Sequence, residues 1–144
     1  MSQESDPLTP ELARLVLQVA DRLRAEFRRA AGRLELPVAQ AALLARLEEP
    51  TPMRSLAEVL SCDASHVTGI VDGLERRGLV ERRAAPKDRR VKLVALTDEG
   101  CRRRAELGES YRSGIAPVLA LPEEERRALH ESLGRVVAGL DEAR

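Results

Sequence analysis

The stretch from Met53 to Gly100 constrains the fold more than any other part of this 144-residue chain. It holds two short segments with helical apolar periodicity, separated by a tight corner, and then two strand-like segments separated by a charged loop. One face of each expected helix is apolar: Leu56, Ala57, Val59 and Leu60 in the first, and Ala64, Val67, Ile70, Val71 and Leu74 in the second. This order predicts a helix-turn-helix followed by a β-hairpin.

The second helix of this pair has clear boundary signals. Asp63 closes the corner Ser61-Cys62-Asp63 as an N-cap, and Gly78 ends the helix in the left-handed conformation. The face opposite the apolar stripe is small or polar and carries Ser65, His66, Thr68, Gly69 and Asp72. Such a helix fits the DNA major groove, where short side chains reach the base edges.

Two glycines, Gly69 and Gly73, interrupt this helix, although glycine costs roughly 1 kcal/mol relative to alanine inside a helix. Either the backbone approaches DNA closely at these positions, or the glycines have no functional meaning.

The two strand-like segments, residues 79–83 and 91–96, flank the loop 84–90. Pro86 and the charged side chains keep this loop out of any core. A basic loop beside a helix-turn-helix is typical of a wing, which contacts phosphates and the minor groove. The alternative is a solvated hairpin that contacts nothing.

The candidate DNA-binding residues come from the start of the first helix, the first turns of the second helix and the loop. They are Arg54, Ser55, Ser65, His66, Thr68, Gly69, Lys87, Asp88, Arg89 and Arg90. We expect one of the two wing arginines to enter the minor groove and the other to pair with Asp72 or Asp88. Arg54, Ser55 and Lys87 are expected at phosphates. We expect solvated charges at Arg76, Arg77, Arg82 and Arg83.

The net charge is zero, with 24 basic and 24 acidic residues, which by itself argues against nucleic acid. The distribution is uneven, because residues 76–104 contain 11 basic and 4 acidic residues. Charges more than about 8 Å apart are largely screened at physiological salt. Acidic ends of the chain therefore need not cancel a basic patch at the wing.

Helical segments on both sides of this lobe carry long apolar stripes. In Thr9-Pro10 and again in Thr51-Pro52, we expect the threonine as the N-cap and the proline as the first helical residue. We expect Gly32 to break the first helix, residues 37–47 to form a buried helix, and Thr97 to cap a long helix. The stripes comprise Leu12, Leu15, Val16, Val19, Leu23 and Phe27 near one end, and Leu129, Leu133, Val136 and Leu140 near the other. So small a lobe cannot cover them all, and exposed stripes mark an interface. We therefore expect a homodimer; the alternative is a monomer whose terminal helices pack only on each other.

The expected fold class is mainly α with a small β-hairpin wing (α+β). We expect one domain over residues 1–144, with a winged-helix lobe at 37–100 and dimerisation helices at 8–34 and 101–144. With no 18-residue apolar run and a polar, acidic N-terminus, nothing indicates a membrane span or a signal peptide, so we expect a cytoplasmic protein. The preference for Arg, Ala and Leu over Lys is typical of a GC-rich bacterial genome.

The two cysteines are too few for a disulfide framework. Cys62 is expected as a small hydrophobe in the corner. Cys101 lies in the first turn of a helix and precedes three arginines, features that lower a thiol pKa and favour redox reactivity. The alternative is a packed, inert thiol on the apolar stripe that Cys101 forms with Gly108, Tyr111, Ile115 and Val118 at near-heptad spacing. His66 and His130 give no zinc spacing, so we expect no metal and no cofactor. No nucleophile–base pair or phosphate-binding glycine loop indicates an enzyme.

Several of these motifs together resemble the MarR-type winged-helix transcriptional regulators. The marks are Leu36-Pro37-x-x-Gln40-x-x-Leu43-Leu44, Leu56-Ala57, the run from Val67 to Val80, Asp88-Arg89-Arg90 and Leu96-Thr97-x-x-Gly100. The family usually has Thr at the Pro37 position and often a larger basic residue at the Gly69 position.

The resemblance implies a dimeric, sequence-specific regulator of double-stranded DNA with a near-palindromic site, most simply a repressor. A small aromatic or anionic effector would bind between the dimer helices and the winged lobe and release the DNA. One Tyr and one Phe do not outline an aromatic-lined pocket for it. The alternatives are a regulator switched through the Cys101 thiol, or a winged helix acting as a protein–protein module.

Overall fold

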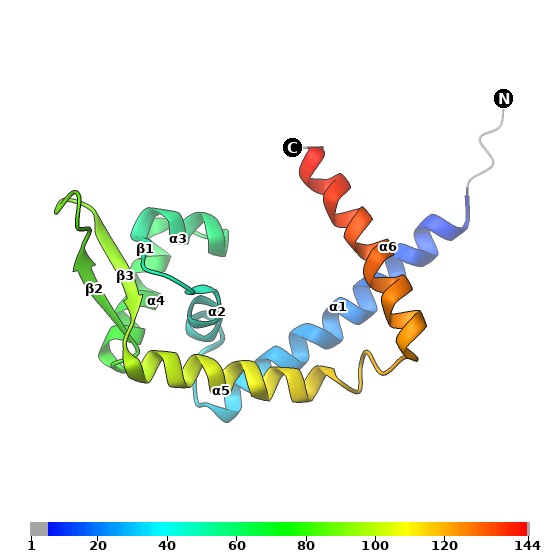
Figure 1. The fold of residues 1–144 in the computed structure, drawn as a ribbon, viewed down its shortest axis with the longest axis horizontal. Coiled ribbons are helices and arrows are strands. Elements are labelled where there is room, and N and C mark those ends of the chain that lie inside the picture. The colour runs from blue at the N-terminus through cyan, green and yellow to red at the C-terminus, as the bar shows by residue number, and fades with distance from the viewer. Residues whose placement is uncertain (1–5, 144) are drawn as a thin grey trace.

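The computed structural model describes residues 6–143 and is mostly helical, with one small antiparallel sheet (Figure 1). The elements in chain order are α1 (Leu8–Arg33), α2 (Val38–Arg46), β1 (Thr51–Pro52), α3 (Met53–Leu60), α4 (Ala64–Arg76), β2 (Val80–Ala84), β3 (Lys92–Leu96), α5 (Asp98–Ile115) and α6 (Glu123–Glu142). The expected fold class is confirmed. The expectation about a signal peptide falls partly on residues 1–5, outside the described residues.

Helix α1 does not begin as the sequence predicted. Pro7 occupies the N-cap position, and the carboxylate of Asp6 accepts hydrogen bonds from the Leu8 N–H (3.0 Å) and the Thr9 hydroxyl (2.7 Å). Thr9 is therefore a hydrogen-bond donor inside the first turn. Asp6, and not Thr9 as predicted, is the hydrogen-bond acceptor at the start of the helix. The hydrogen bond from Thr9, and then that from Leu8, lower the pKa of Asp6 from its ordinary value. The helix continues through Gly32 to Arg33 before it ends.

The helix-turn-helix is formed by α3 and α4, as predicted. Ser61 closes α3 in the left-handed conformation (φ 52°), and Gly78 follows α4 with φ 71°. Asp63 is the N-cap of α4, but its carboxylate accepts no capping hydrogen bond. The inward residues Val67, Ile70, Val71 and Leu74 are buried, whereas Ala64 and Val59 are exposed, contrary to the predicted stripes.

The hairpin forms with Val80 opposite Leu96 and Ala84 opposite Lys92. The prediction that Thr51 caps a helix beginning at Pro52 is wrong, because Thr51 and Pro52 pair with Val94 and Leu93 as a third strand. The sheet order is β1-β3-β2, and α3 begins only at Met53 with Pro52 as its N-cap. A two-residue strand is too short to produce a periodic signal in the sequence.

The core of the lobe surrounds α2, which contacts α1, α3, α4 and α5. Its largest fully buried side chains come from five elements and the turn after α2: Leu43, Leu44, Leu47, Val67, Val71, Leu74, Val80, Val94 and Leu107. A close approach joins this core to α5, because a Cβ on Gly100 would lie 1.9 Å from the Leu79 carbonyl oxygen. Thr97 caps α5 by accepting a hydrogen bond from the Gly100 N–H, as predicted.

The terminal helices extend away from this lobe (Figure 1). Helix α1 crosses α5, where the carboxylate of Glu26 is 5% exposed, pairs with Arg22 and Arg29, and occupies the space beside Gly114. Helix α6 has no buried residue. The apolar stripes of α1 and α6 are exposed within the protomer, with Leu12 at 51% and Leu140 at 64%.

Candidate nucleic-acid interface

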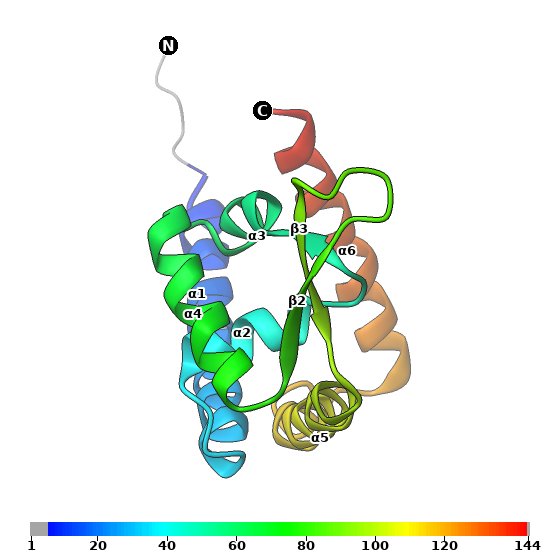
Figure 2. The ribbon, with the colours of Figure 1, turned by 90° about the vertical axis from the view of Figure 1, so that its left-hand side faces the viewer.

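The outward face of α4 carries the side chains that the sequence placed there. Ser65, His66, Thr68 and Gly69 are all exposed. The Thr68 hydroxyl donates to the Ala64 carbonyl oxygen at 3.0 Å, which uses its proton and leaves its lone pairs outward. Seen from the lobe end, α4 and the β2–β3 hairpin lie side by side at the front of the molecule (Figure 2).

The loop between β2 and β3 is organised by its own backbone and by Asp88. The Ala85 N–H donates to Val91 O at 2.9 Å, and the Val91 N–H donates to Asp88 O at 3.1 Å. The Asp88 carboxylate accepts the Arg90 backbone N–H at 3.0 Å. Asp88 therefore shapes the turn, while the side chains of Lys87, Arg89 and Arg90 are exposed.

The expectation that one wing arginine pairs with Asp72 or Asp88 is not met. Asp72 instead binds Arg82 of β2, whose guanidinium donates to Asp72 at 2.5 Å and to Glu75 at 3.0 Å. Arg82 is only 26% exposed, so it is not the solvated charge that was expected. Arg82 thereby links α4 to the first strand of the hairpin and offsets part of the negative charge of the two acids on the helix. Only the tertiary arrangement reveals it, because the partners belong to different elements.

The two glycines of α4 have different surroundings. A Cβ on Gly69 would meet nothing within 4 Å, and this position is exposed. A Cβ on Gly73 would lie 2.2 Å from the amide nitrogen of Gln40 on α2, in the interior. Gly73 therefore permits the packing of α4 against α2 and has no access to DNA. The Gln40 amide oxygen is buried without a hydrogen-bond partner.

At the start of α3, Arg54 is exposed and Ser55 is half-buried. Arg54 and Arg90 line the same hollow beside β3, so the structure brings a candidate from the helix-turn-helix together with a candidate from the wing.

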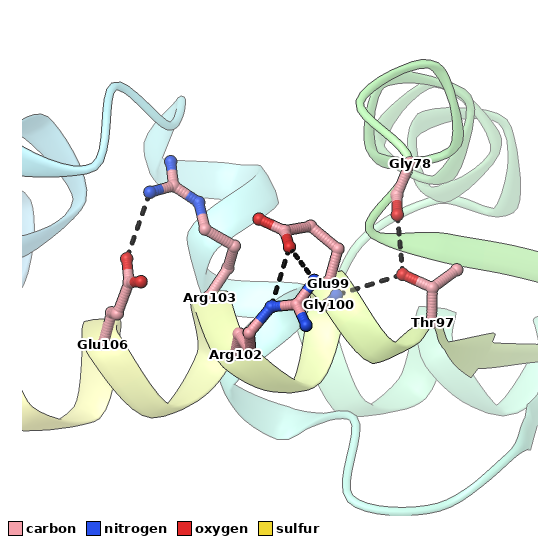
Figure 3. A network of polar contacts seen from close by, with 7 residues as sticks. All are labelled: Gly78, Thr97, Glu99, Gly100, Arg102, Arg103 and Glu106. Carbon is pink, nitrogen blue, oxygen red and sulfur yellow. Dashed lines mark hydrogen bonds and ion pairs between the residues drawn. The ribbon is translucent and has the colours of Figure 1, made fainter.

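The Cys101 thiol is exposed, which contradicts its expected place on a packed stripe. The arginines that follow it have other partners. Arg102 binds Glu99 and Arg103 binds Glu106, as Figure 3 shows. Arg103 also donates to Leu34 O, and Arg104 donates to Ala45 O. The hydrogen bond to Glu99 raises the pKa of Arg102. Cys62 is half-buried and packs on the core, as expected for a small hydrophobe.

A hollow of about 530 Å³ lies where α1, α2 and α5 meet. The only Phe and the only Tyr of the chain, Phe27 and Tyr111, both line it, with ring centroids 5.7 Å apart at 81°. The sequence did not outline this hollow, because the two aromatic residues lie on different helices and meet only in the fold. Arg24, Arg28 and Arg46 also line the hollow, and neither Arg28 nor Arg46 forms an ion pair within residues 6–143.

Within the described residues, no helix is long and apolar enough to cross a membrane. The same part of the chain holds no group of three or more His, Cys, Asp or Glu residues placed to bind a metal ion.

Residues 36–92 match the MarR family. A curated relative, the uncharacterized HTH-type transcriptional regulator YdgJ of Bacillus subtilis, is 35% identical over 82 residues. That match covers 56% of this chain and only about half, 50%, of the relative's length.

Two solved structures are similar over nearly the whole chain. CouR from Rhodococcus jostii RHA1, bound to p-coumaroyl-CoA, is 27% identical with a TM-score of 0.72, covering 92% of this chain and 95% of that one. A probable transcriptional regulator from Pseudomonas aeruginosa is 31% identical with a TM-score of 0.63, covering 90% of this chain and 98% of that one.

Proposed function

The chain belongs to the MarR family of winged-helix transcriptional regulators, and from that premise we propose that it is a homodimeric repressor released from its DNA site by a small anionic, aromatic effector. Family members are DNA-binding regulators and not enzymes. One observation carries the proposal: an exposed polar helix face and an exposed loop with unpaired arginines lie side by side on the lobe.

In this proposal α4 enters the major groove. Ser65, His66 and Thr68 reach base edges, and Gly69 lets the backbone come close. Because the Thr68 proton is already donated to Ala64, its oxygen accepts hydrogen bonds, which favours the amino groups of cytosine or adenine. An arginine of the wing enters the adjacent minor groove, while Arg54, Ser55 and Lys87 contact phosphates.

The dimer is proposed from the uncovered apolar faces of α1 and α6. Leu129, Leu133, Val136 and Leu140 are exposed along α6, and a groove of about 560 Å³ lies at the junction of α5 and α6. A second copy of the chain buries these faces with helices of matching apolar pattern. Two recognition helices about 34 Å apart then read successive major grooves of a near-palindromic site.

The wing is tested by Arg89→Ala and Arg90→Ala, with binding measured on duplexes selected from a random pool. Each variant is expected to bind more weakly while remaining dimeric by sedimentation. Arg102→Ala is the matched control, because this arginine binds Glu99 on α5, which follows the end of β3 away from the loop. Unchanged affinity in both wing variants would contradict the assignment. Binding that is insensitive to salt would favour the protein–protein module instead.

The effector site is proposed at the hollow between α1, α2 and α5. Phe27 and Tyr111 offer a surface for an aromatic ring, and Arg28 and Arg46 offer unpaired charges for an anion. CouR has been solved with an aromatic acyl-CoA bound, which agrees with this chemistry. An occupant of the hollow would move α2, whose Gln40 packs against Gly73 of α4. A coupling of roughly 1–3 kcal/mol is sufficient for a switch.

p-Coumarate and p-coumaroyl-CoA are suitable probes, together with Arg28→Gln and Arg46→Gln. We expect an aromatic anion to raise the melting temperature of the wild type and weaken DNA binding, and both responses to shrink in the variants. A ligand-free test uses Ala42→Trp, which fills the hollow from α2 and should weaken DNA binding. Full affinity in a folded, dimeric Ala42→Trp protein would contradict the coupling through α2.

Cys101 is the second candidate for the switch, because its thiol is exposed and therefore open to oxidants. Peroxide would then weaken DNA binding by the wild type and leave Cys101→Ser unaffected. Equal affinity before and after treatment, with Cys101 unmodified by mass spectrometry, removes this candidate.

A further inference from the structure

We propose that Arg54, Arg90 and Lys92 form one pocket for a single DNA backbone phosphate, and that Lys92 is a DNA contact in addition to those named above. The inference rests on the proposed DNA-binding function. It concerns the hollow of about 340 Å³ between the start of α3 and the base of the wing, which Pro52, Met53 and Val91 also line.

The sheet register explains why residues distant in sequence meet there. Pro52 lies opposite Leu93 in the β1–β3 pair, so the chain enters α3 directly beside the start of β3. Arg54 stands in the first turn of α3, Lys92 begins β3, and Arg90 ends the wing loop. The third strand, which the sequence did not predict, therefore assembles the pocket.

The charges in this hollow are unbalanced. None of the three side chains forms an ion pair with an acid in residues 6–143, whereas Arg82 and Arg83 of the neighbouring strand are both paired. Like charges gathered in one hollow repel each other, and the repulsion grows as they approach. An anion between them removes this cost, and three donors suit the oxygens of a phosphate.

The position of the hollow identifies the source of that phosphate. In Figure 2, α3 lies between α4 and the hairpin. The hollow is lined by Met53 and Arg54, which belong to the first turn of α3. The sugar–phosphate backbone separates the major groove from the minor groove. A strand that passes between a helix in one groove and a loop in the next must therefore cross this part of the surface. With Arg90 at the backbone, Arg89 becomes the arginine for the minor groove.

The number of phosphates held by these residues can be measured from the salt dependence of binding, because each neutralised phosphate contributes about 0.9 to the slope of log K against log salt. The variants are Arg54→Gln, Arg90→Gln, Lys92→Gln and the triple substitution, on duplexes selected from a random pool. One phosphate per protomer predicts that the triple variant loses about 1.8 of slope per dimer. Three separate phosphates predict a loss of about 5.4.

Arg83→Gln is the matched control, since Arg83 lies on β2, is exposed and pairs with Glu81; its slope should equal that of the wild type. Circular dichroism and sedimentation establish that every variant remains folded and dimeric. A loss of slope in the triple variant that corresponds to three phosphates per protomer overturns the shared pocket, and so does Lys92→Gln that binds DNA as tightly as the wild type. A wild-type protein that binds no duplex at all overturns the proposed function instead.

A second measurement distinguishes backbone from free phosphate. A neutral methylphosphonate at one position of each half-site should weaken wild-type binding and leave the triple variant unaffected. Two results together overturn the backbone assignment. The first is that no methylphosphonate position weakens wild-type binding while leaving the triple variant unaffected. The second is that inorganic phosphate, at constant ionic strength, weakens DNA binding by the wild type more than DNA binding by the triple variant.

Discussion

Two glycine-to-alanine substitutions in helices of the lobe should have opposite effects on stability. Alanine is favoured over glycine inside a helix by about 1 kcal/mol. At Gly69 a Cβ meets nothing within 4 Å, so Gly69→Ala should gain about that amount. At Gly100 a Cβ would lie 1.9 Å from the Leu79 carbonyl oxygen and 2.9 Å from its carbon, which are backbone atoms that cannot rotate away.

The Gly100→Ala overlap can be relieved only if α5 moves away from the start of β2. That movement loosens the hydrogen bond from the Thr97 N–H to Leu79 O (3.1 Å) and the one from the Thr97 hydroxyl to Gly78 O (2.6 Å), the second of which Figure 3 shows. Overpacking costs about 1–3 kcal/mol, and more where backbone must shift. Because the helical gain applies to both variants, they should differ in unfolding free energy by the overpacking cost, about 1–3 kcal/mol.

For a chain of this length, 1 kcal/mol shifts the melting temperature by about 3 °C, so the two variants should melt about 3–9 °C apart. Calorimetry and urea titration measure this at equal protein concentration, because the stability of the proposed dimer would depend on concentration. If Gly100→Ala is as stable as Gly69→Ala, the close approach of α5 to Leu79 is wrong. Gly69→Ala also reports on function: if it is more stable but binds DNA less tightly, the backbone of α4 approaches the DNA there.

Three further substitutions test individual contacts. Arg82→Ala should weaken DNA binding without lowering the salt slope, because Arg82 holds Asp72 and not a phosphate; a slope reduced by about 0.9 per protomer would identify a direct phosphate contact. Leu133→Asp should shift the dimer toward monomer in sedimentation and lower DNA affinity with it, and a variant that stays dimeric excludes α6 from the interface. Thr9→Ala should raise the pKa of Asp6 toward its ordinary value, which an NMR titration measures. Because that pKa is lowered in the folded protein, the stability that Asp6 provides is present above its ordinary pKa. This stability is lost as the pH falls through the lowered value.

The sequence predicted the elements whose signal is local. Periodic apolar positions predicted α4, and two strand-like segments on either side of a charged loop predicted the hairpin. Each of these patterns is complete within one segment of the chain. The start of α1 was misplaced because Asp6 and Thr9 both carry oxygen atoms that can accept hydrogen bonds at a helix start. In the fold Pro7 is the N-cap residue, and Asp6 accepts hydrogen bonds from the Leu8 N–H and the Thr9 hydroxyl. Strand β1 was missed because its pairing with β3 depends on tertiary contact and not on composition.

The candidate site was predictable to the extent that exposure follows from the amphipathic pattern. The outward positions of α4 were correctly placed in solvent, while the role of Gly73 depended on the distant Gln40. The aromatic hollow also escaped prediction, because Phe27 and Tyr111 belong to helices that meet only in the folded chain. Whether the named residues bind DNA remains a prediction that the experiments above address.

The number of charged residues in a segment does not show which of the charges have partners in the fold. Residues 76–104 contain 11 basic and 4 acidic residues, but the arginines of α5 in that window bind Glu99 and the carbonyl oxygens of Leu34 and Ala45. Arg82 and Arg83 are paired with acids as well. The cations without an acid partner in the described residues of the wing region are Lys87, Arg89, Arg90 and Lys92, with Arg54 beside them on α3. Part of the uncompensated positive charge of this chain of zero net charge therefore lies on the face formed by α4 and the wing, and another part lies at Arg28 and Arg46 beside the hollow between α1, α2 and α5. It follows that neutralising a paired arginine should alter stability or geometry, whereas neutralising these five cations together should lower the salt dependence of binding.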